Sequence, residues 1–328
     1  MIGLVFAVLM LIVVGYSFYD QSRNALSKQK AVILLKATDD QAEDYPTSKG
    51  LKYMAKLLDE RSNGHIKMMV YSGGVLGAGK DILDATQAGT LDIGRISVSS
   101  LVSYSPELNV FLTPFLFRDS DHEWKVLDGP VGKNLLQGLE KSGFVGLGYY
   151  DSGARSFYSK TPVNSPQDLQ NKKIRVLDVK IQKEMITTMG GQPFTTPFLE
   201  VYPALQTGTL DAAENSPPSF YSTKHYELAK YLTLTEHAVA PEAILISQKT
   251  WDTLSTEDQE MIRQATKDST VYQKQLWKEY TEQSMVKLKE QGVTIITPNK
   301  DLFRQALAPL YANNPEYKEL IKEIQDTK

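Results

Sequence analysis

Three arginines beside predicted strand ends have the clearest potential for binding chemistry in this sequence. Arg175 lies inside a short apolar run, Arg155 lies near the start of a second predicted domain, and Arg95 follows a short predicted strand. Because strand side chains alternate between faces, Ile174 and Val176 can point to one side of a sheet while Arg175 points to the other. Such an arginine reaches solvent, pairs with a carboxylate of the fold or binds a ligand, and most arginines are surface or structural residues. Several arginines beside strand ends favour a cleft between two domains that holds an anion.

The glycine-rich stretch 74–81 (GVLGAGKD) resembles a phosphate-binding loop, because it follows a predicted strand and precedes a predicted helix. The P-loop motif requires Ser or Thr after its lysine to ligate magnesium, whereas this sequence has Asp81 there. A carboxylate at that position would place a negative charge near the phosphates. We therefore interpret the stretch as an ordinary strand-to-helix turn, and the sequence does not predict an NTPase.

Patterns of catalytic and metal-binding residues are also missing from the sequence. The histidines at positions 65, 122, 225 and 237 have no metal-site spacing, and there is no Gly-x-Ser-x-Gly motif and no cysteine. The acidic residues within 39–44 lack the spacing of a calcium loop, so a solvated loop is the simpler interpretation. One or two of them could still reach a ligand, because they follow a strand end. We predict no metal, no cofactor and no enzymatic activity.

The composition is that of a globular protein with two domains. The chain has 328 residues, of which 41% are hydrophobic and 23% are charged, and its formal net charge is −3. At this length two domains of about 130–150 residues each are expected. There is no basic stripe, so nucleic-acid binding has little electrostatic support.

The N-terminus predicts export. Residues 1–19 contain no charged side chain, and a polar spacer follows. A signal peptide fits the position and the apolar core, although basic residues and a good cleavage pattern are missing. An uncleaved membrane anchor fits the length of the apolar stretch. Residues 1–29 are therefore predicted to be a signal peptide or an anchor plus spacer, and either choice places the rest of the chain in the periplasm.

Hydrophobic patterns predict alternating strands and helices, typical of an α/β fold with a largely parallel sheet. The predicted strands of the first domain are 31–37, 66–71, 91–93 and 143–150, and its helices are near 46–61 and 80–88. The second domain has predicted strands 155–159, 173–177 and 211–214 and helices near 180–189 and 200–206. Residues 243–247 are predicted to return as a strand to the first domain. A long helix then begins at a capping box at residues 255–258 and ends near Gly292.

Longer motifs resemble the substrate-binding proteins of tripartite ATP-independent periplasmic (TRAP) transporters, the DctP-type family. These motifs are DSGARSFY (151–158), KIRV (173–176) and TPFLEVYPALQTGTLDAAEN (196–215). The stretches LTPFLFR (112–118), YELAKYLTLT (226–235) and SQKTWDTL (247–254) extend the resemblance to about residues 31–310. One departure is Glu-Asn-Ser-Pro-Pro where many members have Glu-Asn-Pro, and we expect only a local loop difference there.

The resemblance implies a two-domain periplasmic binding protein-like α/β fold with a hinge and a long helix spanning both domains. Domain I would contain residues 31–152 and 241–280, and domain II residues 153–240 and 281–328. A monomeric receptor of this kind would close around an organic acid without transforming it. It would then deliver the acid to the membrane permease subunits of the transporter.

Three residues match the carboxylate site of the family. Arg175 matches an arginine that forms a two-pronged salt bridge with the ligand carboxylate. Arg155 matches a second arginine beside it, and Asn215 matches an asparagine that reaches the same carboxylate. The planar fork of a guanidinium suits a carboxylate, and a charge-assisted bidentate pair is strong and directional.

Three further residues match positions that face the rest of the ligand. Phe198 matches an aromatic residue that packs on the ligand body, and Asp178 matches a polar ligand-facing position. Arg95 falls at a variable ligand-facing position of the first domain. The motifs resemble a hexuronate-binding branch, so D-glucuronate or D-galacturonate is the expected ligand. The alternatives are an aldonate, a C4-dicarboxylate that would use Arg95 as a second anion partner, or a membrane-anchored ligand sensor with the same fold.

Overall fold

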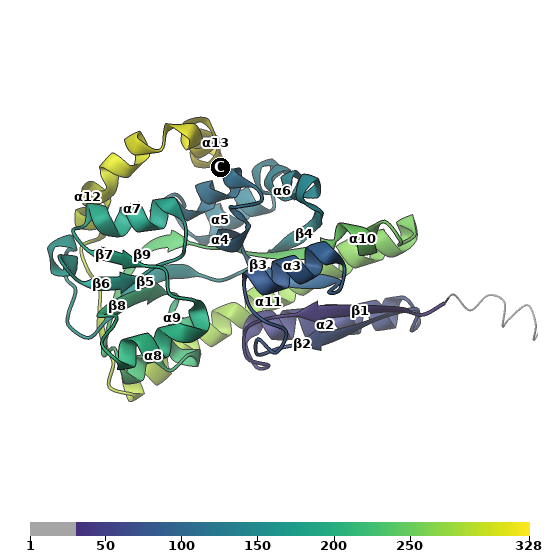
Figure 1. Ribbon diagram of the computed structural model, residues 1–328, viewed down its shortest axis with the longest axis horizontal. Helices are drawn as coiled ribbons and strands as arrows, with labels where there is room; N and C mark the ends of the chain where they lie inside the picture. The colour runs from purple at the N-terminus through teal and green to yellow at the C-terminus, as the bar shows by residue number, and fades with distance from the viewer. Residues whose placement is uncertain (1–30) are drawn as a thin grey trace, which may run out of the picture.

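The structure is a computed structural model that describes residues 31–328. The signal peptide or anchor predicted for residues 1–29 lies outside these described residues. Within residues 31–328, none of the helices combines the length and the hydropathy that a bilayer crossing requires. The described chain forms two α/β domains, each built on its own sheet and arranged side by side along the long axis of the molecule (Figure 1).

The sheet of the first domain has five strands in the order β2-β1-β3-β10-β4. β1 is parallel to β2 and β3, whereas β10 is antiparallel to both of its neighbours. The predicted, largely parallel sheet is therefore confirmed, as is the return of residues 243–247 to it. The strands are β1 (Ile33–Thr38), β2 (Ile66–Tyr71), β3 (Ile93–Ser97), β4 (Phe144–Tyr150) and β10 (Glu242–Ser247). The strand predicted at 91–93 begins at Ile93 and continues to Ser97, so Arg95 lies within a strand and does not follow one.

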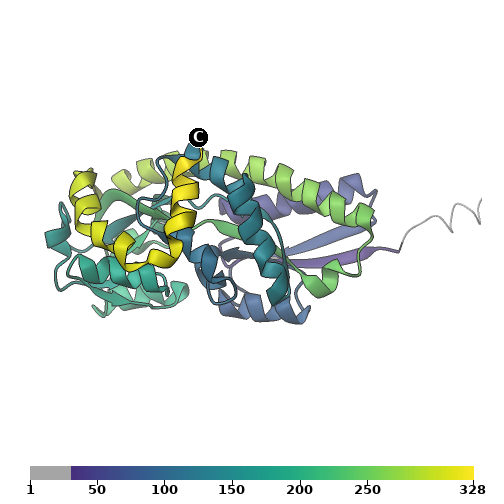
Figure 2. The same ribbon diagram turned by 90° about the horizontal axis from the view of Figure 1, so that it is seen from above.

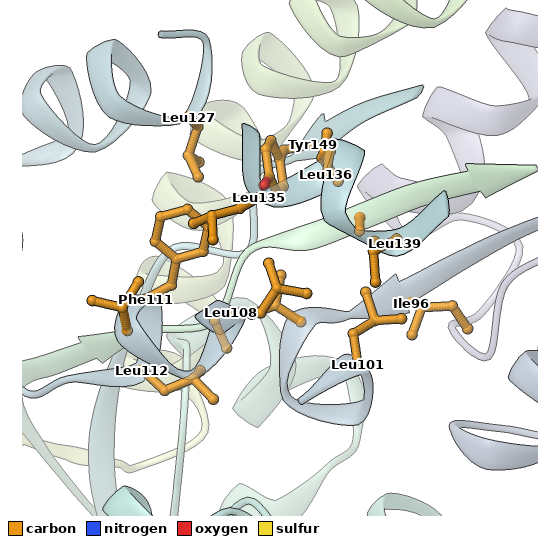
Figure 3. Close-up of a cluster of buried hydrophobic side chains, with 14 of the residues drawn as sticks. Ile96, Leu101, Leu108, Phe111, Leu112, Leu127, Leu135, Leu136, Leu139 and Tyr149 are labelled. Carbon is orange, nitrogen blue, oxygen red and sulfur yellow. The ribbon is translucent and has the colours of Figure 1, made fainter. Parts of the chain in front are cut away.

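Alternating side chains of β10 show how this sheet is covered on both faces. Ile244 and Ile246 belong to a buried cluster with α2 (Pro46–Arg61) and α11 (Thr256–Glu290). Ala243 and Leu245 point into a second buried cluster on the other face. Figure 3 shows part of this second cluster. It contains side chains of α3 (Lys80–Ala88), α4 (Val98–Leu101), α5 (Ser120–Leu127) and α6 (Pro130–Gln137).

The sheet of the second domain has six strands in the order β11-β9-β5-β8-β6-β7. The strands are β5 (Ala154–Ser159), β6 (Lys173–Arg175), β7 (Gln192–Phe194), β8 (Ala212–Asn215), β9 (Tyr231–Val239) and β11 (Thr294–Ile296). The helices that follow or precede them are α7 (Lys180–Thr188), α8 (Val201–Gln206), α9 (Pro217–Ser222) and α12 (Lys300–Asn313). The three predicted strands of this domain are confirmed. The strands β7, β9 and β11 were not predicted. The pattern of the nine-residue strand β9 is broken at Glu236, which has a φ of 47°.

The long helix α11 lies along both domains, as predicted (Figure 2). Its first turn is capped by Ser255, whose hydroxyl accepts a hydrogen bond from the backbone N–H of Asp258, and Gly292 with a φ of 76° follows its end. At about 1.5 Å per residue, 35 residues span about 52 Å. The helix packs against α2 and β4 of the first domain and α9 of the second. A continuous helix therefore connects the two sheets.

The C-terminal segment crosses back between the domains. α12 packs against α7 of the second domain, whereas α13 (Lys318–Asp326) buries Ile321 and Ile324 in a cluster with α5 and α6 of the first. The Arg118 guanidinium donates to the carbonyls of Gln325 (2.8 Å) and Thr327 (2.6 Å). The sequence did not predict this return, because it assigned all of residues 281–328 to the second domain. The domain boundaries themselves stay a prediction.

Candidate functional site

A cavity of about 770 Å³ lies between the two domains, beside strand ends and the loops that follow them. This is the position in which open α/β sheets bind ligands. All six residues that the sequence predicted to face a ligand line the cavity: Arg95, Arg155, Arg175, Asp178, Phe198 and Asn215. The tertiary structure thus brings together residues that are spread over 120 positions of the chain. Their contact with a ligand stays a prediction.

Arg175 ends strand β6 and is only 7% exposed. Its Nε donates to the carbonyl of Thr196 at 3.0 Å, and within residues 31–328 no carboxylate lies within salt-bridge distance of its guanidinium. Burial and the neighbouring Arg155 lower the pKa of Arg175, against the pull of Glu214. A buried cation without a counter-ion is costly. An anion in the cavity would supply the missing charge.

Arg155 is the second positive charge near Arg175, but unlike Arg175 it has a carboxylate partner. Its Nε donates to Glu214 Oε2 at 2.5 Å and its Nη2 to Glu214 Oε1 at 2.8 Å, a two-pronged pair with both groups buried. The pairing follows from β5 and β8, in which Phe157 is opposite Glu214, so Arg155 lies diagonally across from Glu214 on the same face. Although burial alone would raise it, the Arg155 charge brings the pKa of Glu214 to about 2. Arg155 is therefore held by the fold.

Asn215 is oriented by the same strand pair. Its Oδ1 accepts from Arg155 Nη1 at 3.1 Å and from the backbone N–H of Ser216 at 2.8 Å. These two bonds leave the amide NH2 as the group that can donate into the cavity. We call Arg155, Arg175, Glu214 and Asn215 the clamp pole. It holds two guanidinium groups and one carboxylate, a formal charge of +1.

The first domain presents a different group at the other wall of the cavity. Arg95 is 4% exposed, and its guanidinium donates to Asp39 Oδ1 from Nε (3.0 Å) and Nη2 (2.5 Å), to Glu242 Oε2 from Nη1 (2.6 Å) and to Asp40. The three acids come from the loop after β1 and the start of β10, on either side of β3 in the sheet. We call Arg95, Asp39, Asp40 and Glu242 the acid pole. Three carboxylates around one guanidinium give it a formal charge of −2.

Burial disfavours the charged forms of both Arg95 and Glu242, and the neighbouring charges oppose this effect. Burial opposes ionisation of Arg95, but the three carboxylates prevail and raise its pKa well above its ordinary value. Burial raises the pKa of Glu242, although the Arg95 charge opposes the shift. Even with a proton on Glu242, the pole would keep one negative charge. The sequence pointed to the acids near Asp40 but missed Glu242, which directly precedes the predicted strand 243–247 and could have been considered.

Phe198 and Asp178 lie at less enclosed positions of the cavity wall. Phe198 is half-buried in a short 3-10 helix after β7. The side chain of Asp178 is 71% exposed, and its carboxylate accepts from Lys183 Nζ at 3.0 Å. Phe198 is thus an aromatic residue of the cavity wall, whereas Asp178 is an exposed residue already paired within its own domain.

Tyr45 and Ser219 connect the two domains at the cavity, and the sequence did not predict either. The Tyr45 hydroxyl and Ser219 Oγ are 2.8 Å apart, joining the start of α2 to α9. The Tyr45 ring packs edge-on against Trp277 of α11 with 5.7 Å between centroids. Beneath Trp277, Gly153 has a φ of 64°, and a Cβ there would lie 2.8 Å from the indole nitrogen. No sequence signal links partners 174 residues apart.

The glycine-rich stretch 74–81 contributes Gly79, Lys80 and Asp81 to the cavity wall. Lys80 Nζ donates to both oxygens of Asp84, at 2.7 and 2.6 Å, one helical turn away. Its charge is therefore already matched on the surface of α3. This agrees with the interpretation of the stretch as a turn that shapes the wall of the site.

Comparison with protein families identifies the class of this chain. A profile of the family described as bacterial extracellular solute-binding protein, family 7 (DctP), matches residues 38–318. A solute-binding protein of Chromohalobacter salexigens is 34% identical over 86% of this chain and 86% of its own length. The C4-dicarboxylate-binding periplasmic protein DctP of Rhodobacter capsulatus is 29% identical over 85% of each chain.

Solved structures of TRAP periplasmic solute-binding proteins have the same fold. A Bradyrhizobium protein in complex with D-galacturonate is 43% identical, with a TM-score of 0.86 over 89% of this chain and 99% of that one. A Pseudomonas putida F1 protein with bound D-glucuronate is 35% identical, with a TM-score of 0.88 over 90% and 98% of the two chains.

A Citrobacter koseri protein of the same class has structures both with bound ligand and in an apo, open form. With bound D-glucuronate its TM-score to this chain is 0.86, over 90% of this chain and 99% of that one. In its apo, open structure the TM-score is 0.81, over 89% and 98%. Both have 33% identity. Over the whole chain, the structure described here is thus more similar to the ligand-bound form than to the open one.

Proposed function

This chain belongs to bacterial extracellular solute-binding protein family 7, the DctP family, and is a solute receptor of a TRAP transporter; we propose that its solute is a hexuronate, D-glucuronate or D-galacturonate. Receptors of this family are periplasmic and bind small carboxylates. They deliver these solutes to membrane permease subunits and are not enzymes. The proposal therefore concerns which acid is bound and which residues bind it.

The buried guanidinium of Arg175 carries the proposal. It lines the cavity and has one backbone carbonyl as its protein partner within residues 31–328. A carboxylate on its free nitrogens would form a bidentate, charge-assisted pair. Arg155 adds a second positive charge, and the NH2 group of Asn215 adds a donor. A neutral hexose would leave Arg175 buried and unpaired, so acids are selected over neutral sugars.

The remaining wall suits a polyhydroxylated ring. Phe198 offers an aromatic face, and Asp40 and Glu242 offer carboxylate oxygens that can accept from hydroxyl groups. Structures with 35% and 43% identity to this chain hold D-glucuronate and D-galacturonate. We further propose that the chain is exported by its N-terminal segment and acts as a monomer with the domain boundaries predicted above.

Binding measurements on the purified protein test this function. The panel contains D-glucuronate, D-galacturonate, D-gluconate, succinate, sialic acid and neutral hexoses, read by thermal shift and isothermal titration calorimetry. A ligand at a hundred times its Kd stabilises the folded state by about 2.7 kcal/mol. Stabilisation by the uronates and none by neutral hexoses is expected. Stabilisation by succinate alone would replace the proposed solute, and no response to any acid would contradict carboxylate binding.

A further inference from the structure

We propose that the acid pole recognises the non-carboxylate end of the ligand through its hydroxyl groups and rejects ligands with a second carboxylate at that end. This rests on the proposed function, since it assumes that the first carboxylate binds at Arg175. The receptor would then select mono-anionic polyhydroxy acids over aldarates and C4-dicarboxylates. Arg95 would be a ring-oxygen or hydroxyl ligand and not a second anion partner.

The hydrogen bonds of Arg95 are the first step of the argument. A guanidinium has five N–H groups. Arg95 uses Nε, both Nη2 hydrogens and one Nη1 hydrogen on its three acids, which leaves one N–H on Nη1. One N–H cannot form the two-pronged pair that makes an arginine a strong carboxylate ligand. It can donate to a single ring or hydroxyl oxygen.

The net charge of the acid pole is the second step. The Arg95 cation is outnumbered by Asp39, Asp40 and Glu242, all of which lie within salt-bridge distance of it. An additional carboxylate at this wall would meet a group of the same net charge and be repelled by it. The clamp pole has the opposite sign, with two guanidinium groups against Glu214. The cavity therefore suits a molecule that is anionic at one end only.

The acceptors that face the cavity are the third step. Asp40 and Glu242 line the cavity with side-chain exposures of 16% and 13%, whereas Asp39 is fully buried behind them. Asp40 Oδ1 accepts from Arg95 and Gln41, and Glu242 Oε2 accepts from Arg95. Each carboxylate thus has a second oxygen without a protein donor among residues 31–328. Hydroxyl groups of a sugar acid are donors that would complete these two acceptors.

The decisive experiment compares two pairs of acids by calorimetry on the full chain, D-gluconate with D-glucarate and D-galacturonate with galactarate. In each pair the second acid carries an additional carboxylate at the far end. D-gluconate and D-glucarate are both open chains and differ in that terminal group alone, so this pair isolates the charge, whereas galactarate also lacks the pyranose ring of galacturonate. We expect the mono-acid of each pair to bind at least about a hundredfold more tightly.

Two variants assign this selectivity to the acid pole. Glu242→Gln and Asp40→Asn each remove one negative charge, and each should narrow the mono-acid preference by about tenfold or more. Asp40→Asn is included because its side chain is partly exposed, so it leaves a testable protein if Glu242→Gln does not fold. Glu290→Gln removes the same charge from an exposed surface pair at the end of α11 and should leave the preference unchanged.

The outcomes separate this inference from the proposed function. Galactarate binding as tightly as galacturonate in the parent protein would overturn the acid-pole inference and leave the uronate function in place. An unchanged mono-acid preference in both acid-pole variants would overturn the assignment to these residues. If uronates do not bind and succinate does, the proposed solute and the inference both fail. If no acid of the panel binds, the carboxylate function fails and the inference falls with it.

Discussion

Each pole of the cavity contains a buried arginine, but the two arginines have different partners. Arg95 in the first domain is surrounded by three carboxylates, whereas Arg175 in the second domain has a backbone carbonyl as its protein partner within residues 31–328. Burial lowers the pKa of both guanidinium groups, but the three carboxylates raise the pKa of Arg95 above its ordinary value, whereas the pKa of Arg175 stays lowered. An arginine satisfied by its own fold is poorly suited to bind an anion. The comparison therefore favours the unsatisfied one, Arg175, as the proposed anion site.

Arg155 shows that proximity to the site does not by itself make an arginine a ligand clamp. It lies in the clamp pole, yet Glu214 already accepts both prongs of its guanidinium. Its remaining Nη1 bond goes to Asn215. Arg155 thus supplies positive potential and orients Asn215, while Arg175 keeps its terminal nitrogens available. The four predictions below test this division, from the largest expected effect to the smallest.

Removing the partner of Arg155 should cost the most. Glu214→Gln leaves a buried guanidinium without its counter-ion, so we expect a loss of about 3–5 kcal/mol in the free energy of unfolding. Urea denaturation at pH 7 measures it. Glu290→Gln, which breaks an exposed pair with Lys287, should change stability by about 0.5 kcal/mol or less. A loss below about 1 kcal/mol for Glu214→Gln would contradict the structural role of the pair.

Ionisation of Glu214 in the clamp pole should stabilise the fold, whereas ionisation of Glu242 in the acid pole should destabilise it. Glu214 has a folded pKa of about 2 against an ordinary value of 4.5, so its contribution is present above pH 4.5 and is lost as pH falls toward 2. That contribution is up to about 3 kcal/mol. The folded pKa of Glu242 is raised, so its ionisation costs stability as pH rises through that value.

Denaturation of the parent protein, Glu214→Gln and Glu242→Gln between pH 7 and pH 3 measures both effects. The stability advantage of the parent over Glu214→Gln should shrink toward low pH. The stability of the parent relative to Glu242→Gln should instead increase as the pH falls. If the free-energy difference between the parent and each variant changes with pH in the same direction for both variants, the two poles do not have opposite charge environments.

Replacing Arg175 should affect ligand binding more than folding. Arg175→Lys keeps the charge but loses the planar fork, so uronate affinity should fall by about a hundredfold, close to 2.7 kcal/mol. The ligand-free melting temperature should stay the same or rise, because the buried cation has no counter-ion to lose. Arg61→Lys, which lies on the surface beside Asp268, is the matched control. Unchanged affinity in Arg175→Lys, measured by calorimetry, would refute the clamp.

The hydrogen bond between the domains should have the smallest effect. Tyr45→Phe removes the bond to Ser219 and keeps the ring contacts, so affinity should fall by about three- to tenfold through a weaker closed state. A double-mutant cycle with Ser219→Ala measures the coupling. Tyr53→Phe, whose ring packs on Tyr272, is the control. Additive effects of Tyr45→Phe and Ser219→Ala would show that the bond does not couple the domains.

Much of the fold could be predicted from local patterns. Alternation and helical periodicity located the five strands of the first sheet, three of the six strands of the second and the long helix α11, because each buries a regular face along a continuous segment. β9 was missed, since its pattern is interrupted at Glu236. The packing of α13 against α5 was also missed, because an amphipathic helix does not specify which distant surface covers its apolar face.

The sequence by itself determined the approximate positions of eight strands, the residue types near them and the family motifs that pointed to Arg95, Arg155 and Arg175 as residues of one cavity. Only the tertiary structure decided which arginine remains available to an anion. Asp39 and Glu242 lie 56 and 147 positions from Arg95, and Glu214 lies 59 positions from Arg155. Whether a charge is paired depends on which strand ends meet in space. The order of the strands in the two sheets determines which strand ends are neighbours, and local sequence patterns do not specify that order.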